Sequence, residues 1–422
     1  MLAALRNAFK IPELRKRILY TVALLVVFRI GTHAPVPGVD ARALAEGLNI
    51  AGGGIFGFLD MFAGGALERF SLFAMGVSPY ITASIILQLL TAVVPSLEAL
   101  AKEGPEGRRK LQDYTRYGTV VLGIFQALGT TMLARNYGVL AFPGLGGILL
   151  IVVTLTAGTV FLMWLGEKIT ENGIGNGVSL LIFTGIVARL PGSTWLTIRS
   201  IGQGGLSPVS FIAFLVIAVV VIGGVILIQE GQRRIPVQYA KRVVGRRVYG
   251  GQSTYIPLRV NQAGVMPVIF ASSVLTFPLT LAQFIPALSG LTRWLDVGTI
   301  GYNILYVALT IFFTYFYTAV TFDPKDIADN MRKHGGFIPG LRPGWPTTQY
   351  LERVLTRITL VGAIFLAVIA VSPYLMATIT RVPMNLFYFG GTGLLIMVGV
   401  ALDTMKQIEA HLVMRHYEGF MS

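Results

Sequence analysis

The sequence has no cysteine, and only 13% of its 422 residues are charged. The lack of cysteine excludes disulfide bonds, zinc sites with cysteine ligands and thiol catalysis. The GxxxxGK motif of P-loop enzymes is also missing, which excludes nucleotide hydrolysis by that mechanism. The four histidines show no metal-site spacing, and they are His33, His334, His411 and His416. We therefore expect no metal, no cofactor and no catalytic residue.

Apolar residues are abundant, at 54% of the sequence, and the mean hydropathy is +0.69. A helix needs about 20 largely apolar residues to cross the hydrocarbon core of a bilayer. Ten stretches approach or reach that length, at residues 18–34, 72–94, 117–134, 148–166, 174–190, 208–228, 262–284, 299–320, 356–377 and 385–402. The pattern predicts an all-α membrane protein with ten transmembrane helices.

The basic residues are distributed unequally between the two sides of the predicted spans. Of the 34 Lys and Arg, 26 lie in or at the margin of the N-terminus and the gaps after the even-numbered spans, against seven on the opposite side. Because basic loops stay in the cytoplasm, we expect both termini there. The stretch after the first span, from His33 to Gly38, has no small-x-small cleavage site, so we expect the first span to be retained.

Five spans fall in each half of the chain, residues 1–200 and 201–422, on either side of a Gly/Ser-rich stretch at 200–208. An odd number of spans in each half allows the halves to be inverted repeats, as in many transport proteins. No acidic or basic residue lies near the middle of a span, which argues against an ion-coupled pump. A solute transporter with broken helices remains an alternative. An intramembrane enzyme is disfavoured because the spans hold neither a Ser/His/Asp set nor an HExxH motif.

A short apolar segment, from Ile55 to Phe62, lies between the first two spans and is flanked by glycines. It would form a helix of roughly 12 Å, which is too short to cross the bilayer. It is either a re-entrant plug, near residues 55–65, or an amphipathic loop on the outer surface. Irregular backbone at membrane depth survives only inside protein or a wet cavity, and the residues alone favour neither reading.

Two gaps on the cytoplasmic side, residues 229–260 and 321–355, are rich in arginine and in turn residues. In the first, 247–256 is predicted to form two short strands around a Gly250-Gly251 turn. In the second, Asp323-Pro324 predicts a helix that runs to Lys333. A folded basic surface favours docking of a polyanion or an acidic protein. The simpler alternatives are that the charges of the first loop only fix the orientation of the spans, and that Arg342 in the second loop contacts a lipid phosphate.

A glycine-rich stretch, Gly173-Ile-Gly-Asn-Gly177, precedes the fifth span. It is similar to a phosphate-binding loop, but no strand precedes it and no lysine follows. A tight loop that leads into the span is the favoured interpretation.

Several motifs along the chain resemble those of the SecY family, the central subunits of bacterial protein-translocation channels. They are Gly107-Arg-Arg-Lys110, Ile174-Gly-Asn-Gly177, Gly231-Gln-Arg-Arg234, Gly245-Arg-Arg-Val-Tyr-Gly-Gly-Gln-Ser-Thr254 and Val260-Asn-Gln-Ala-Gly264. The resemblance extends from Ile11-Pro-Glu-Leu14 to the short tail after Asp403. It implies two inverted five-helix halves around a central pore, with a short re-entrant plug helix.

The resemblance also implies roles for individual residues. An apolar ring would close the pore, and its members would be Val77, Ile81, Ile182, Ile186, Ile269 and Ile396. The plug would include Ile55, Phe56, Phe58, Leu59, Met61 and Phe62. A lateral gate toward lipid, between spans 2–3 and 7–8, would carry Gln88, Gln126 and Asn261, although these residues could equally join helices by hydrogen bonds. The docking residues would be Arg233, Arg234, Arg246, Arg247 and Arg342.

The expected function is a passive channel that passes unfolded secretory proteins across, and releases apolar segments into, the cytoplasmic membrane of a bacterium. The resemblance implies a heterotrimer with SecE and SecG, and docking of the SecA motor or of the ribosome through its rRNA. The net charge of +14 is also consistent with contact between the basic loops and anionic lipids.

Overall fold

The computed structural model describes residues 9–41, 43–44, 60, 63–239, 242–244, 247–249, 253–282, 299–380 and 391–418. Each of the ten predicted spans overlaps a described helix. In order these are α2 (Pro12–Gly31), α5 (Ser78–Val93), α7 (Pro105–Asn136), α8 (Leu145–Asn172), α9 (Gly177–Gly202), α10 (Pro208–Glu230), α11 (Met266–Ala282), α13 (Ile300–Thr321), α15 (Trp345–Thr380) and α16 (Gly391–Glu418). Two shorter helices lie between them, α6 (Pro95–Lys102) and α14 (Pro324–Lys333).

Six helical stretches of the described chain are long and apolar enough to cross a membrane by themselves, namely α7, α8, α9, α10, α15 and the stretch that α13 begins. A seventh is counted if α5 and α6, which meet at a bend of 99°, form one broken span. The bend follows Val93, where Pro95 starts α6. The chain is a multi-pass membrane protein whose longest helices belong to both halves of the sequence.

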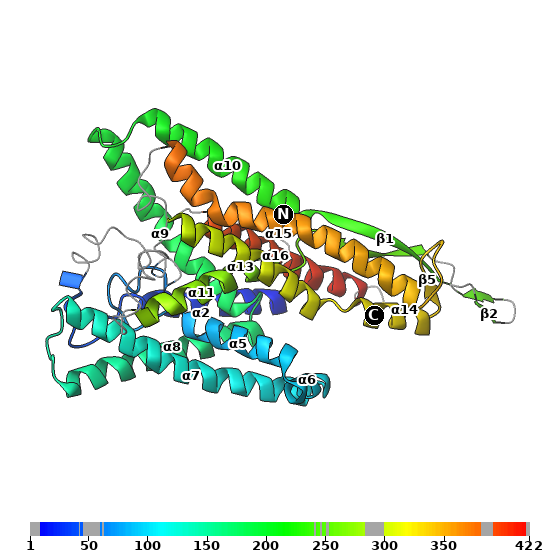
Figure 1. Cartoon of the computed structure of the whole chain (residues 1–422), viewed down its shortest axis with the longest axis horizontal. Coiled ribbons are helices and arrows are strands. Elements are labelled where there is room, and N and C mark those ends of the chain that lie inside the picture. Colours follow the sequence, from blue (N-terminus) through cyan, green and yellow to red (C-terminus); the bar gives the residue numbers. More distant parts are fainter. Residues whose placement is uncertain are drawn as a thin grey trace.

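Most helices of the two halves lie on opposite sides of the bundle, while α9 of the first half reaches across toward α10 (Figure 1). Helices α5, α7 and α8 pack together on one side, and α10, α15 and α16 on the other. Contacts across the middle join α9 to α16 and α11 to both α5 and α7. The largest buried apolar cluster lies between the halves and takes side chains from helices of both.

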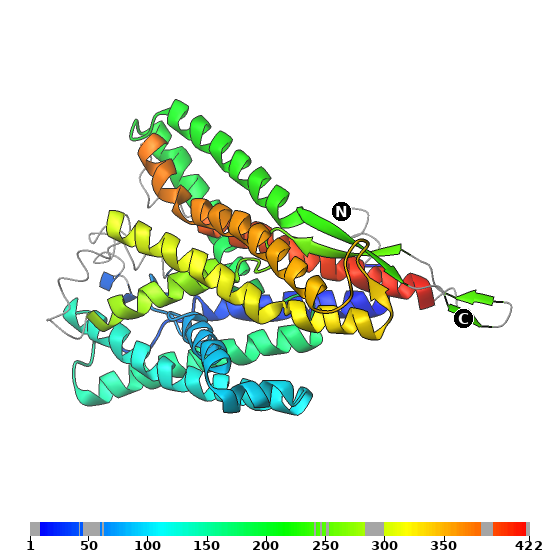
Figure 2. The ribbon, with the colours of Figure 1, turned by 45° about the vertical axis from the view of Figure 1, so that its right-hand side comes forward.

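A β-ribbon continues from α10 beyond the end of the bundle (Figure 2). Strand β1 (Gln232–Tyr239) pairs antiparallel with β4 (Ser253–Arg259), so that Ile235 lies opposite Ile256, and the short β5 (Gly336–Phe337) joins its other edge. A separate pair forms the tip, from β2 (Arg242–Val244) and β3 (Arg247–Tyr249).

The hairpin predicted around Gly250-Gly251 is therefore wrong in its pairing. Its two strands exist, but β3 pairs with β2 and β4 pairs with β1. Strand β1 buries Ile235 and Val237 against Leu258, and this apolar face outweighs the turn signal of the two glycines. The two glycines predict a turn from the sequence alone. Strand β1, the true partner of β4, is not predicted, because it contains Pro236 and has the composition of a basic linker.

The helix predicted after the eighth span is confirmed. The Asp323 side chain accepts hydrogen bonds from the backbone N–H groups of Lys325 and Asp326, at 2.8 and 3.4 Å, and Pro324 occupies the first turn. The helix ends at Lys333, two residues before Gly335, which has a φ of +71°. This short helix packs on α15 at the same end of the bundle as the ribbon.

Candidate pore and docking surfaces

The six side chains of the predicted apolar ring lie in one buried cluster. Their exposed fractions are between 0% and 8%, and they come from the start of α5, from α9, from α11 and from α16. The cluster brings together residues that are up to 319 positions apart in the sequence, from Val77 to Ile396. The side chains are aliphatic and β-branched, so they offer a passing polypeptide neither hydrogen bonds nor charge.

The chain turns sharply just before α5. Gly76 has a φ of +57°, and a Cβ atom there would lie 3.3 Å from the Cα of Ala63. The turn ends at Val77, the N-cap residue, and Pro79 in the first turn favours the start of the helix. The backbone of Ala63 therefore lies beside the residue that precedes Val77.

The six predicted plug residues lie outside the described residues, but Asp60 and the segment 63–76 are described. The Asp60 carboxylate accepts hydrogen bonds from the backbone N–H groups of Leu67 and Glu68, at 2.8 and 3.0 Å. It also forms an ion pair with Arg189 near the end of the apolar part of α9, where the N–O distance is 2.5 Å. Both side chains are largely buried, at 7% and 12% exposed.

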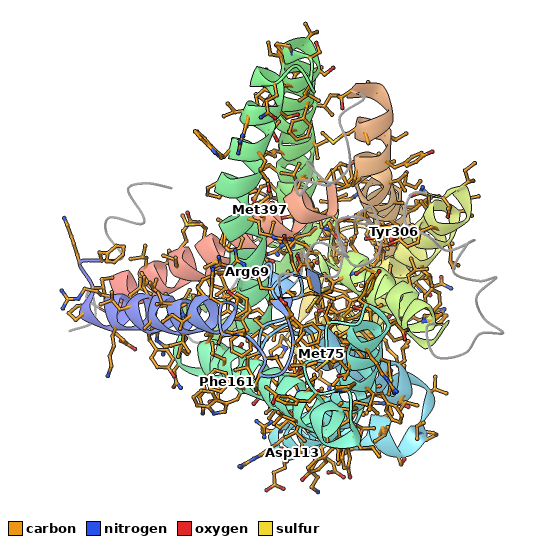
Figure 3. The ribbon with its side chains drawn as sticks, turned by 90° about the vertical axis from the view of Figure 1, so that its left-hand side faces the viewer. Arg69, Met75, Asp113, Phe161, Tyr306 and Met397 are labelled. Carbon is orange, nitrogen blue, oxygen red and sulfur yellow. The ribbon has the colours of Figure 1, made fainter. Side chains whose placement is uncertain are left out.

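Two further contacts hold this segment in place. Arg189 also pairs with Glu68 at 2.5 Å. A Cβ atom on Gly64, which has a φ of +68°, would lie 2.7 Å from the Cα of Gly185, so only glycine fits there. Figure 3 looks at this end of the bundle and shows Arg69, in the same segment, near the middle of the view.

Sequence reasoning missed this ion pair. Asp60 and Arg189 are 129 residues apart, and nothing local predicts that they meet. A signal was nevertheless present, because each is a charged residue beside long apolar stretches. Such residues are expensive in a membrane unless they are paired.

The three predicted lateral-gate residues are not joined by hydrogen bonds among the described residues. The Gln88 side chain donates to Ser84 of its own helix at 3.2 Å, and the Asn261 side chain donates to the Gly264 carbonyl at 2.9 Å. Asn261 is 5% exposed, and its side-chain carbonyl oxygen has no hydrogen-bond partner among the described residues. Gln126 is half-buried on α7. Gln88 and Gln126 lie on α5 and α7, and α11, which begins five residues after Asn261, contacts both helices.

The predicted docking arginines are partly described. Arg233 and Arg234 are exposed on β1, and the Arg234 guanidinium lies 4.8 Å from the centre of the Tyr255 ring, an arrangement that favours a cation–π contact. Arg246 lies outside the described residues, as does the side chain of Arg247 on β3. Exposed Arg342 lies between Gly340 and Gly344, both with positive φ, and its carbonyl oxygen accepts a hydrogen bond from Thr347 at 2.9 Å.

The glycine-rich loop before α9 is a structural junction, as predicted. The backbone N–H groups of Ile174, Gly175 and Gly177 donate to side chains on α2, α16 and α8 respectively. These acceptors are Thr21, Gln407 and Thr170, at 2.9 to 3.0 Å. The N–H groups that a phosphate would need are therefore already used within the bundle.

Sequence comparisons identify relatives along the whole chain. The sequence model of the SecY family matches residues 71–405. A protein translocase subunit SecY from Thermotoga maritima is 51% identical, and the alignment covers 100% of this chain and 98% of that protein. The subunit of the same name from Thermus thermophilus is 48% identical, again over 100% of this chain and 98% of the relative.

Solved structures with the same fold are more distant in sequence. One of a protein-conducting channel superposes with a TM-score of 0.68 at 21% identity, and 96% of each chain is covered. Another, of Sec61 in a canine ribosome–channel complex from the endoplasmic reticulum, has a TM-score of 0.65 at 19% identity, with the same coverage. A third, with a TM-score of 0.66 at 21% identity and the same coverage, concerns a SecY plug domain that stabilises the closed state of its channel and maintains a membrane seal.

Proposed function

Because the chain belongs to the SecY family and is a protein-conducting channel, we propose that its six buried ring side chains form the constriction through which an unfolded polypeptide passes. The observation that carries this proposal is their convergence, from four helices of both halves, in one apolar cluster. An apolar ring lets a chain slide without binding it, and it resists ion leak by excluding water.

The segment from Ile55 to Phe62 would act as the plug on the outer side of the ring. Two contacts support this position. Asp60, which lies inside the segment, pairs with Arg189 on α9, and Gly64, just after the segment, packs against Gly185, the residue before Ile186 of the ring. The end of the plug would thus be tied to the wall of the pore close to its narrowest part. In a protein of the same fold, the plug domain stabilises the closed state.

The lateral gate would open where α11 meets α5 and α7. Gln88, Gln126 and Asn261 would weaken closure there, since polar side chains between helices make a dry seam less stable. Asn261 supports this assignment, because its buried carbonyl oxygen has no partner in the described structure and would gain one when the seam opens.

The chain would be passive. Its family consists of channel subunits and not of enzymes, so we assign it neither a catalytic residue nor a cofactor. Energy for transport would come from the SecA motor, from the translating ribosome or from the membrane potential. The exposed arginines Arg233, Arg234 and Arg342, together with Arg246 and Arg247, would dock these partners. The Sec61 channel of similar fold was solved in a complex with a ribosome.

In its working state the chain would be the central subunit of a heterotrimer with SecE and SecG in the cytoplasmic membrane of a bacterium. Both termini and the basic loops would face the cytoplasm. The β-ribbon, α6 and α14 lie at one end of the bundle, which fits a single cytoplasmic face (Figure 1). Anionic lipids would surround the basic residues at that face.

Export in reconstituted vesicles tests this function. Vesicles that contain the chain with SecE and SecG should protect a secretory preprotein from protease when SecA and ATP are supplied. They should show no saturable uptake of small solutes. Saturable solute uptake without preprotein export would instead support the solute-transporter alternative.

A further inference from the structure

A groove of about 370 Å³ lies at the cytoplasmic end of α15, where the first residue pairs of the β-ribbon pass beside the helix. Its basic lining comes from Arg233 on β1 and from Arg353 and Arg357 on α15. Its other wall is provided by Tyr350, Ile358 and Val361. None of these lining residues except Arg233 belongs to the predicted docking set, and the channel mechanism uses none of those on α15.

The three guanidinium groups form no ion pair among the described residues. All three side chains are exposed. Three unpaired cations around one groove repel each other, and a bound anion would relieve this repulsion. A phosphate group suits the site because guanidinium groups bind phosphate oxygens through two parallel hydrogen bonds.

The groove also crosses the level at which α15 becomes apolar. Arg353 and Arg357 are one helical turn apart, and Val361, 55% exposed, lies one turn further along the same face. After Arg357 the helix has no charged residue up to its end at Thr380. The groove thus has a cationic end that matches the phosphate of a phospholipid and an apolar end that matches its acyl chains.

We propose that this groove binds one anionic phospholipid, with the phosphate among Arg233, Arg353 and Arg357 and an acyl chain along Ile358 and Val361. A free phosphate or a nucleotide would leave the apolar wall of the groove without a partner. An acidic protein segment would place its polar backbone against that apolar wall. The proposal rests on the orientation given under the proposed function, which places this end of α15 at the cytoplasmic leaflet, where anionic lipids gather.

Because the chain has no cysteine, a single Val361→Cys can carry a fluorescent label in the groove. The complete complex is reconstituted in bilayers that contain brominated phosphatidylglycerol or brominated phosphatidylcholine, and quenching of the label by each lipid is compared. One arginine near an anionic lipid is worth about fivefold in affinity. We expect half-maximal quenching at a lipid fraction at least that many times lower for phosphatidylglycerol than for phosphatidylcholine, and Arg353→Gln with Arg357→Gln to abolish the preference.

The matched control is Arg108→Gln with Arg109→Gln, which removes the same charge from exposed positions of α7 at the same end of the bundle. The preference should survive in this control. An equal loss in both double variants would mean a general surface potential and would overturn the proposal. No quenching by either lipid would also overturn it, since the groove would then be covered by protein. Preprotein export, measured on the same vesicles, separates failure of the lipid site from failure of the channel.

Discussion

The carboxylate of Asp60 and the guanidinium of Arg189 meet at 2.5 Å, and this contact ties the end of the expected plug to α9. The two side chains are 7% and 12% exposed, so water screens the pair little. Asp60 is held further by the backbone N–H groups of Leu67 and Glu68. The ion pair and the two hydrogen bonds therefore favour a single position of the predicted plug segment. If the plug moves when the channel opens, the ion pair must break or move with it.

Arg189→Ala should increase ion leak through the resting channel by about tenfold or more. Removal of one partner from a buried ion pair costs about 3 kcal/mol, because the other charge stays buried without compensation, and here the cost falls on the closed state. Conductance of the reconstituted complex in planar bilayers measures the leak.

Arg199→Ala is the control for this variant. Arg199 is an exposed arginine on the same helix, so its loss should leave the resting conductance unchanged. Equal conductance in Arg189→Ala and the unsubstituted channel would show that the pair does not hold the closed state.

Deletion of residues 55–62 should also raise the leak, because the apolar ring alone seals less well than a ring covered by a plug. The coupling to the ion pair needs a shorter deletion, of residues 55–59, which leaves Asp60 in place. If the pair acts by holding the plug, then Arg189→Ala should add nothing to the leak of this shorter deletion, and bilayer recordings of it with and without Arg189→Ala test the coupling. An unchanged leak after the deletion would refute the plug assignment, and additive effects would show that the pair acts on something else.

Gly177→Ala should lower the midpoint of thermal unfolding by about 1–3 °C, because an extra methyl group forced into a packed site costs about 1–3 kcal/mol. The added Cβ atom would lie 1.9 Å from the carbonyl oxygen of Gly166, which belongs to the backbone of α8 and cannot rotate away. Tryptophan fluorescence on heating in detergent measures the shift.

Gly192 gives the matched comparison on the same helix, because no atom of the described residues lies within 4 Å of an added Cβ atom there. Gly192→Ala should be neutral or slightly stabilising, since alanine is favoured over glycine in a helix by up to about 1 kcal/mol. If both variants unfold at the same temperature, the close packing of Gly177 against α8 is not important for stability.

Arg342→Glu should reduce preprotein export by about tenfold or more while the subunit still inserts and assembles, because charge reversal at a docking site turns attraction into repulsion. The two flanking glycines with positive φ hold the turn that presents this side chain. Lys333→Glu, an equal change at an exposed position of α14, should have a much smaller effect. Normal export by Arg342→Glu would rule out its docking role.

The spans could be predicted because hydropathy is a local property. The stretches 208–228 and 299–320, for example, match α10 and α13 to within two residues. The cap of α14 could be predicted for the same reason, since Asp323-Pro324 acts on its own first turn. The ring residues came from a family resemblance and not from periodicity, because a buried isoleucine in a pore and one in a helix interface look alike in sequence.

Other features depend on contacts between distant segments and could not be read from the chain. Asp60 pairs with Arg189 across 129 positions of sequence, so no local pattern relates the two residues. The ribbon pairs β1 with β4, while the local turn at Gly250-Gly251 suggested a different hairpin. The basic groove likewise combines Arg233 on a strand with Arg353 and Arg357 on a helix that begins more than 100 residues later.

The central claim is that a translocating polypeptide passes through the apolar ring, and site-specific disulfide formation tests it most directly. Because the chain has no cysteine, one can be placed at Ile81, Ile182, Ile269 or Ile396, and another in a secretory protein stalled during export. A disulfide forms only when the two Cα atoms come within about 7 Å of each other. We predict a bond at each ring position that depends on stalling, and none at exposed Val219 on α10. Export that proceeds without a bond at any of the four positions would contradict the account and leave the ring as ordinary helix packing.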